Sequence, residues 1–401
     1  MSLDIAQAAL QIDDMAYDLV ARRSHREQRL QRAVSSLLRF PVEQYADISE
    51  DGNSTLGLLP GITESPAARC KSEATNENFS VAAADGSHID IDRHLPVRCF
   101  LINTGIAALN YGDKPDANLY NNCLLYGNED ALVIHDPLTY RRQTIEGTLL
   151  SAKRAVEEIR ALTEAVENLS PHQETLALLD GSLIMLGLVG PLNQEFVLRA
   201  LVEEGFAAAL DELGGIAKQR RLALASYISM PGSTEIVNAI RTVSCHYGST
   251  EQGFCGSSQP ERGPCDNCVD GIRDREIFER MLSTGERSAT FTSNHPIVTQ
   301  YYGDNGVAFF YINVGEEIAR VEVPSWVAKD KSLLNLTHTL ILDQCKRGQG
   351  YPVALMEAHE QAVINGADRR FFVQHLERVL YEKGLPTYTS EKVRSKRVRA
   401  L

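Results

Sequence analysis

The tripeptide Asp-Gly-Ser occurs twice at the end of an apolar run, and each copy places an acid where an enzyme could use it. The first copy, at residues 85–87, follows three alanines, and the second, at residues 180–182, follows "TLALL". An acid that ends a buried strand holds its carboxylate at the rim of the sheet, and the next glycine lets a ligand approach the backbone. If the two strands are neighbours, Asp85 and Asp180 repel each other unless a divalent cation relieves the repulsion. The pair therefore predicts a metal site.

A third acid is expected from the helix between these two strands. Apolar residues from Ile145 to Val166 recur at helical spacing, and Glu146 flanks this stripe near its start. Glu157 projects in nearly the same direction but lies roughly 16 Å further along the helix, so only one of the two can join the site. We expect Glu146 to be the helical ligand, because a short connection links its helix to the preceding strand. Glu157 is the alternative.

A late helix supplies two further polar residues in the segment "GYPVALMEAHEQAV". Tyr351 precedes a proline, so its backbone is extended and Pro352 can begin the helix. His359 follows two turns later and could share a side with Tyr351. An imidazole exchanges protons near neutral pH and binds Mn²⁺ better than Mg²⁺. We predict Tyr351 and His359 as further catalytic residues, with His359 a possible Mn²⁺ ligand.

The order of elements that must position these residues is typical of an α/β fold. Strand-like runs at 81–91, 96–112 and 131–136 precede the long helix and the strand that ends at Asp180. A helical stretch to residue 221, a strand at 222–230 and the strand-like runs "PIVTQYY", "GVAFFYINV" and "EIARVEV" come later. A strand Asp, a helical Glu, a second-strand Asp and a late-helix polar residue are the arrangement of ribonuclease H-like nucleases. We therefore expect a ribonuclease H-like mixed sheet flanked by helices.

Several segments together make the chain resemble the NurA nucleases over about residues 81–380. They are the two Asp-Gly-Ser strands, "SYISMPGSTEIVNAIR", "DREIFERMLSTGERSATF" and "GYPVALMEAHEQAV". The resemblance implies a Mn²⁺-dependent nuclease of DNA end resection, with 5′-to-3′ exonuclease and single-strand endonuclease activity, and it implies a homodimer that works with the hexameric ATPase HerA. It also implies that Asp85 and Asp180 bind metal, that Glu146 is the matching helical acid, and that Tyr351 and His359 are the late-helix catalytic pair.

The remaining segments suggest an organisation around this nuclease domain. Residues 1–80 are predicted as an N-terminal helix and linker, 81–383 as the nuclease domain and 384–401 as a basic tail. A Cys-rich insert at 244–270 interrupts the domain. Its four thiols suit a structural Zn²⁺ site or an iron–sulfur cluster, although ordinary thiols in a loop are the alternative. These thiols belong to Cys245, Cys255, Cys265 and Cys268.

Composition limits the protein classes that remain. The 401 residues carry a net charge of −13, which argues against a protein that coats nucleic acid by charge alone. We find no apolar run of membrane-spanning length and no secretory leader at the N-terminus, so we expect a cytoplasmic protein. Two alternative functions stay open: an actin-like phosphotransferase or ATPase, which also places Asp and Gly after a first strand, and a catalytically silent DNA-binding subunit of a translocase.

Overall fold

The computed structural model describes residues 4–50, 58–74, 76–90, 97–188, 194–246 and 269–385. Within these ranges the chain divides into two compact units, each built from separate stretches of sequence. Unit 1 comprises residues 1–72, 229–294 and 309–320, and unit 2 comprises residues 73–228, 295–308 and 321–401. None of the described helices has the length and apolar character needed to cross a membrane.

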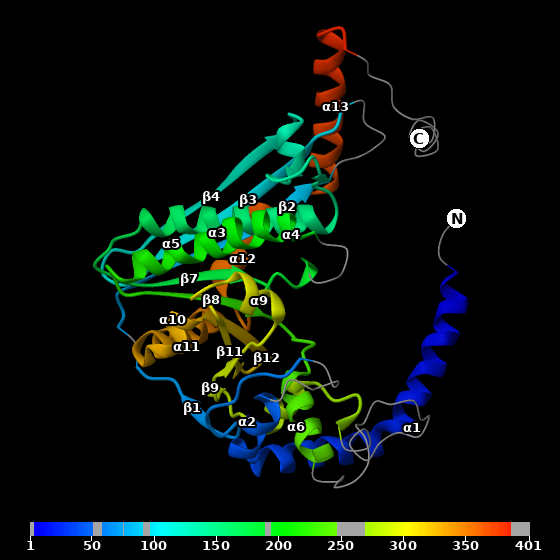
Figure 1. The fold of residues 1–401 in the computed structure, drawn as a ribbon, viewed down its shortest axis with the longest axis vertical. Helices are drawn as coiled ribbons and strands as arrows, with labels where there is room; N and C mark the ends of the chain where they lie inside the picture. Colours follow the sequence, from blue (N-terminus) through cyan, green and yellow to red (C-terminus); the bar gives the residue numbers. More distant parts are fainter. Residues whose placement is uncertain are drawn as a thin grey trace. The chain divides into compact units, whose positions relative to one another are not determined.

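Unit 2 is built on a mixed β-sheet that carries both Asp-Gly-Ser segments (Figure 1). The sheet has the strand order β8-β7-β2-β3-β4. β2, β3 and β4 form an antiparallel meander, β7 pairs with β2 in parallel, and β8 pairs with β7 in parallel. The strands are β2 (Phe79–Ile89), β3 (Phe100–Asn110), β4 (Asp116–Tyr126), β7 (Glu174–Asp180) and β8 (Leu222–Ile228). Helices pack against this sheet, so the predicted α/β class, a mixed sheet flanked by helices, is confirmed.

The two faces of this sheet are covered by different helices. Helix α3 (Thr148–Glu167) packs on the face of Ala82 and Ala84, where its buried stripe joins the main apolar core. Helix α12 (Val353–Ala362) packs on the other face, because the carbonyl of Ala362 accepts hydrogen bonds from the side chains of Ser87 and Asn103. Since side chains alternate along a strand, Asp85 lies on the α12 face and Gly86 on the α3 face.

The other elements of unit 2 complete its layers. A short two-stranded sheet pairs β5 (Val133–His135) with β6 (Arg142–Thr144). Residues 295–308 contribute α9 (Pro296–Tyr301), and β12 (Ile318–Pro324), whose residues 321–324 belong to unit 2, neighbours β8 in the sheet order. The remaining helices are α4 (Glu195–Leu198), the π-helix η3 (Arg199–Ala207), α5 (Ala208–Ala217), α10 (Ser325–Lys329), α11 (Lys331–Arg347), α13 (Gly366–Glu382) and the 3₁₀ turns η1 (Asp130–Leu132) and η2 (Leu186–Leu188).

Unit 1 contains the predicted N-terminal helix, which is α1 (Ile5–Leu38). Its buried residues near the C-terminal end join a second apolar core with α6 and α8. The other elements are α2 (Val42–Glu50), β1 (Arg69–Lys71), α6 (Glu235–His246), α8 (Asp274–Met281), β9 (Glu286–Ser288) and β10 (Phe291–Thr292), together with β11 (Val307–Asn313), most of which lies in this unit. The division at residues 80 and 383 remains a prediction.

Two strand predictions were wrong for identifiable reasons. The third strand of the meander is β4, not residues 131–136, which form only a short turn and β5. β4 is exposed along almost its whole length, so no apolar alternation marks it in the sequence. The run "PIVTQYY" forms helix α9, because Pro296 occupies the first turn and the His295 ring accepts a hydrogen bond from the Ile297 amide.

The predicted Cys-rich site lies outside the described residues. Cys255, Cys265 and Cys268 fall between the described ranges, and only the backbone of Cys245 is described, at the end of α6. The basic tail also lies outside, from residue 386 onward. Both therefore stay predictions from the sequence.

Candidate active site

Asp85 and Asp180 lie on neighbouring parallel strands, Asp85 within β2 and Asp180 at the end of β7. The prediction that Asp85 ends its strand was wrong, because β2 continues to Ile89 in its pairing with β3. β2 and β7 run parallel, and their last paired residues are Ala84 and Leu179. Each aspartate is the next residue of its strand, so both carboxylates emerge on the same face, with backbones about 4.8 Å apart. Gly181 follows in the left-handed region at φ 86°, which glycine adopts without strain.

Each aspartate contacts one of the predicted late-helix residues. Nδ1 of His359 lies 2.7 Å from Oδ2 of Asp85, and the hydroxyl of Tyr351 donates to Oδ1 of Asp180 at 3.0 Å. The Tyr351 ring meets the buried ring of Tyr227 edge-on, with centroids 5.3 Å apart. α12 and the residues that lead into it therefore bring Tyr351 and His359 to the two carboxylates.

Glu158 on α3, which the sequence analysis did not consider, lies against the first Asp-Gly-Ser segment. Its side chain is buried and forms an ion pair with Arg154, with Nε 2.9 Å from Oε1. A β-carbon added to Gly86 would lie 2.4 Å from the same Oε1, so this carboxylate rests directly against the backbone of the first Asp-Gly-Ser segment. Glu158 directly precedes Ile159 of the buried stripe, and this position is the signal that could have identified it.

The two glutamates considered from the sequence lie elsewhere. Glu146 is exposed and precedes Gly147, the N-cap of α3, so it is not a helical residue. Glu157 pairs with Lys153 at 2.6 Å and with Arg160 at 3.6 Å. The assignment of Glu146 as a ligand has no supporting contact with either aspartate among the described residues, whereas Glu158 interacts electrostatically with both.

The electrostatics of the site show that its carboxylates oppose one another's ionisation. Burial raises the pKa of Glu158 to about 7, and the charges of Asp85 and Asp180 add to this rise while Arg154 counters it. The pKa of Asp180 is also raised, first by the loss of water around it and then by Asp85, although part of its side chain is exposed. The hydrogen bond from Tyr351 and the nearby His359 act in the opposite direction.

The donor chemistry of this cluster fits a divalent cation. Carboxylate oxygens suit Mg²⁺ and Mn²⁺, and an imidazole beside them suits Mn²⁺. Mutual repulsion among Asp85, Glu158 and Asp180 is the condition that a bound cation relieves. Across the ranges that the structure describes, however, no three His, Cys, Asp or Glu side chains are gathered closely enough to hold one ion. Ion binding would therefore require these carboxylates to turn from their present partners.

The NurA domain model matches residues 79–364. Among solved structures, the Argonaute of Aquifex aeolicus is similar at 9% identity and a TM-score of 0.29, covering 72% of this chain and 28% of that chain. LC9-RNase H1, a type 1 RNase H with the type 2 active-site motif, is similar at 10% identity and a TM-score of 0.21, covering 53% of this chain and 90% of that chain.

No curated protein matches the sequence. The NurA match includes the described residues of both Asp-Gly-Ser strands, α3, and the helix that carries His359. The chain belongs to the NurA family of nucleases.

Proposed function

We propose that this protein is a divalent-metal-dependent DNA nuclease, with Mn²⁺ as the preferred ion and Mg²⁺ as a possible substitute. One observation carries the proposal: Asp85 and Asp180 lie on adjacent parallel strands, on one face of the sheet, and the buried Glu158 interacts electrostatically with both. The charges of Asp85 and Asp180 contribute to the raised pKa of Glu158, and the charge of Asp85 contributes to that of Asp180, so the site favours a cation. This arrangement supports hydrolysis of a phosphodiester.

In this proposal Asp85, Asp180 and Glu158 hold the ions, with Glu158 in the role that the sequence suggested for Glu146. Bound ions would supply charge stabilisation for the leaving oxygen and orientation for the attacking water. Tyr351 keeps Asp180 in place through its hydroxyl. His359 either joins the ion ligands or, with Nδ1–H donated to Asp85, keeps Nε2 as an acceptor for the water proton.

Membership of the NurA family supports a finer proposal. We propose 5′-to-3′ exonuclease and single-strand endonuclease activity, in the end resection of DNA double-strand breaks, by a cytoplasmic homodimer that works with a HerA-type ATPase. The net charge of −13 fits a nuclease that grips DNA locally or through a partner better than one that coats it.

The decisive experiment uses purified protein, Mn²⁺ and single-stranded DNA labelled at the 5′ or the 3′ end. We expect cleavage that EDTA abolishes and that is lost in Asp85→Ala and in Asp180→Ala. The two labels report the direction of digestion. ATP hydrolysis without DNA cleavage would support the phosphotransferase alternative, and DNA binding without cleavage would support the silent subunit.

A further inference from the structure

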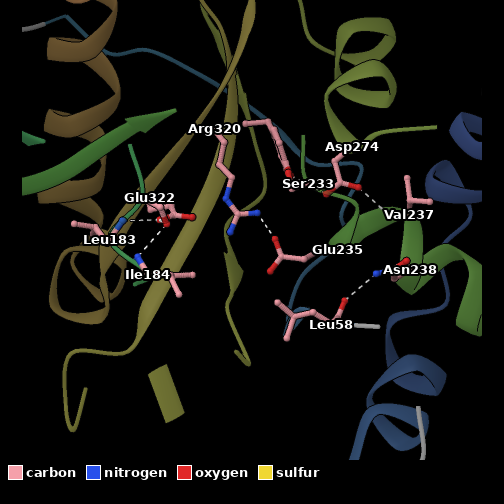
Figure 2. Close-up of polar contacts among 12 residues, drawn as sticks. Leu58, Leu183, Ile184, Ser233, Glu235, Val237, Asn238, Asp274, Arg320 and Glu322 are labelled. Carbon is pink, nitrogen blue, oxygen red and sulfur yellow. Dashed lines mark hydrogen bonds and ion pairs between the residues drawn. The ribbon is translucent and has the colours of Figure 1, made fainter. Parts of the chain in front are cut away.

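The backbone that follows Asp180 is fixed by a buried carboxylate outside the acidic cluster. Glu322, on β12, is 1% exposed. It accepts hydrogen bonds from the Ser182 hydroxyl at 2.7 Å and from the Leu183 amide at 2.9 Å (Figure 2). A charged acceptor forms stronger hydrogen bonds than a neutral one, so this turn is held firmly.

The other polar groups of the same turn are also occupied. The Gly181 amide donates to the carbonyl of Tyr227, and the Ile184 amide donates to the Ser182 hydroxyl at 3.0 Å. The buried Tyr302 hydroxyl donates to the Leu183 carbonyl at 2.8 Å and accepts from the Met185 amide at 3.1 Å. Glu322 and Tyr302 thus bond to the main chain directly after the candidate ligand.

We propose that Glu322 is a positioning residue, which sets the direction of the Asp180 carboxylate by holding the second Asp-Gly-Ser turn. This inference rests on the proposed function. Glu322 acts through Ser182 and Leu183. Groups that hydrogen-bond a metal ligand directly change metal affinity or activity by about 10- to 100-fold when removed, and we expect an effect of this order from the loss of the turn that Glu322 holds.

The test compares Glu322→Leu, Glu322→Gln and Ser182→Ala in the full chain. Leucine removes the acceptor, glutamine keeps one oxygen able to accept both hydrogen bonds, and Ser182→Ala removes one donor with little change in volume. The matched control is Glu235→Gln. Glu235 is a buried glutamate of unit 1 whose carboxylate pairs with Arg320 (Figure 2).

Two readouts besides cleavage are measured. Amide hydrogen exchange follows Leu183, Ile184 and Met185 in metal-free protein, and Mn²⁺ titration followed by electron paramagnetic resonance gives the ion affinity. For Glu322→Leu we expect faster exchange at these amides and an affinity for Mn²⁺ about 10- to 100-fold weaker. Ser182→Ala should change both in the same direction, Glu322→Gln should stay close to wild type, and Glu235→Gln should lower thermal stability alone.

The inference is overturned if Ser182→Ala and Glu322→Leu fold and keep wild-type exchange and Mn²⁺ affinity, while the nuclease function stands. It is overturned equally if Glu322→Gln loses as much as Glu322→Leu, because hydrogen-bond geometry would then not be the cause. If Glu322→Leu does not fold, Ser182→Ala and Tyr302→Phe replace it, and amide exchange and Mn²⁺ affinity are measured in these two variants instead. If the wild-type protein neither binds Mn²⁺ nor cleaves DNA, the proposed function fails and this inference fails with it.

Discussion

Nδ1 of His359 lies 2.7 Å from Oδ2 of Asp85, although 274 residues separate them in the chain. Because an ionised carboxylate can only accept, Nδ1 of His359 donates in this contact. In the neutral ring Nε2 is then the acceptor. The His359 side chain is 60% exposed, whereas that of Asp85 is 15% exposed. A largely buried carboxylate therefore fixes the orientation of an exposed imidazole.

Replacement of this histidine tests its role in proton transfer. We expect His359→Gln to lower the rate of DNA cleavage by about 10²- to 10⁴-fold, the contribution typical of a general base. The control is His375→Gln, at an exposed histidine of α13 that contacts Arg378. Single-turnover cleavage with saturating Mn²⁺ is the measurement. Equal rates in the two variants would remove His359 from the mechanism.

Three glutamate variants identify the helical acid. Glu158→Gln should lower cleavage by about 10³-fold, because an ion ligand stabilises the transition state by several kcal/mol. Glu146→Gln and Glu157→Gln should cleave at nearly the wild-type rate, since Glu146 is exposed and Glu157 is paired with Lys153. All three are assayed at equal concentration after thermal melts verify folding. A loss confined to Glu146→Gln would restore the original prediction from sequence.

The raised pKa of Glu158 makes stability depend on pH in metal-free protein. Its pKa is about 7 in the folded chain against 4.5 in the unfolded chain, so the folded state binds more protons between these values. The free energy of unfolding should then fall as pH rises through this window, by roughly 3 kcal/mol. Glu158→Gln should abolish this part of the pH dependence.

Urea denaturation in EDTA at pH 5 and pH 8 measures the effect. The quantity of interest is the stability of Glu158→Gln minus that of wild type, which should increase between the two pH values. A difference that stays constant with pH would mean that Glu158 ionises at its ordinary pKa.

Gly86→Ala tests whether the glycine makes room for the glutamate. The new methyl group would lie 2.4 Å from Oε1 of Glu158, so the carboxylate must move. Because that oxygen ends a flexible side chain, we expect a small loss of stability and a large loss of cleavage. The control is Gly215→Ala in α5, where an added β-carbon meets no atom within 4 Å. Wild-type cleavage by Gly86→Ala would show that Glu158 is not needed where it lies.

The local patterns in the sequence were sufficient for much of the fold. The apolar runs before Asp85 and Asp180 became the parallel pair β2 and β7, and the stripe between them became the buried face of α3. These predictions succeeded because an element that is buried on one face has apolar residues at the period of that helix or strand. β4 has no such apolar periodicity, since it is exposed along almost its whole length.

The sequence by itself determined that Asp85 and Asp180 follow buried apolar runs, and that Tyr351 precedes a late helix that carries His359. Only the tertiary structure decided which acid of α3 lies against the first Asp-Gly-Ser segment. Glu146, Glu157 and Glu158 all lie near the apolar stripe, and a one-residue step turns a helical side chain by about 100°. Which direction meets Gly86 depends on the depth and rotation of α3 on the sheet. Packing between segments that are distant in the sequence sets the depth and the rotation of α3, and neither can be predicted from local composition.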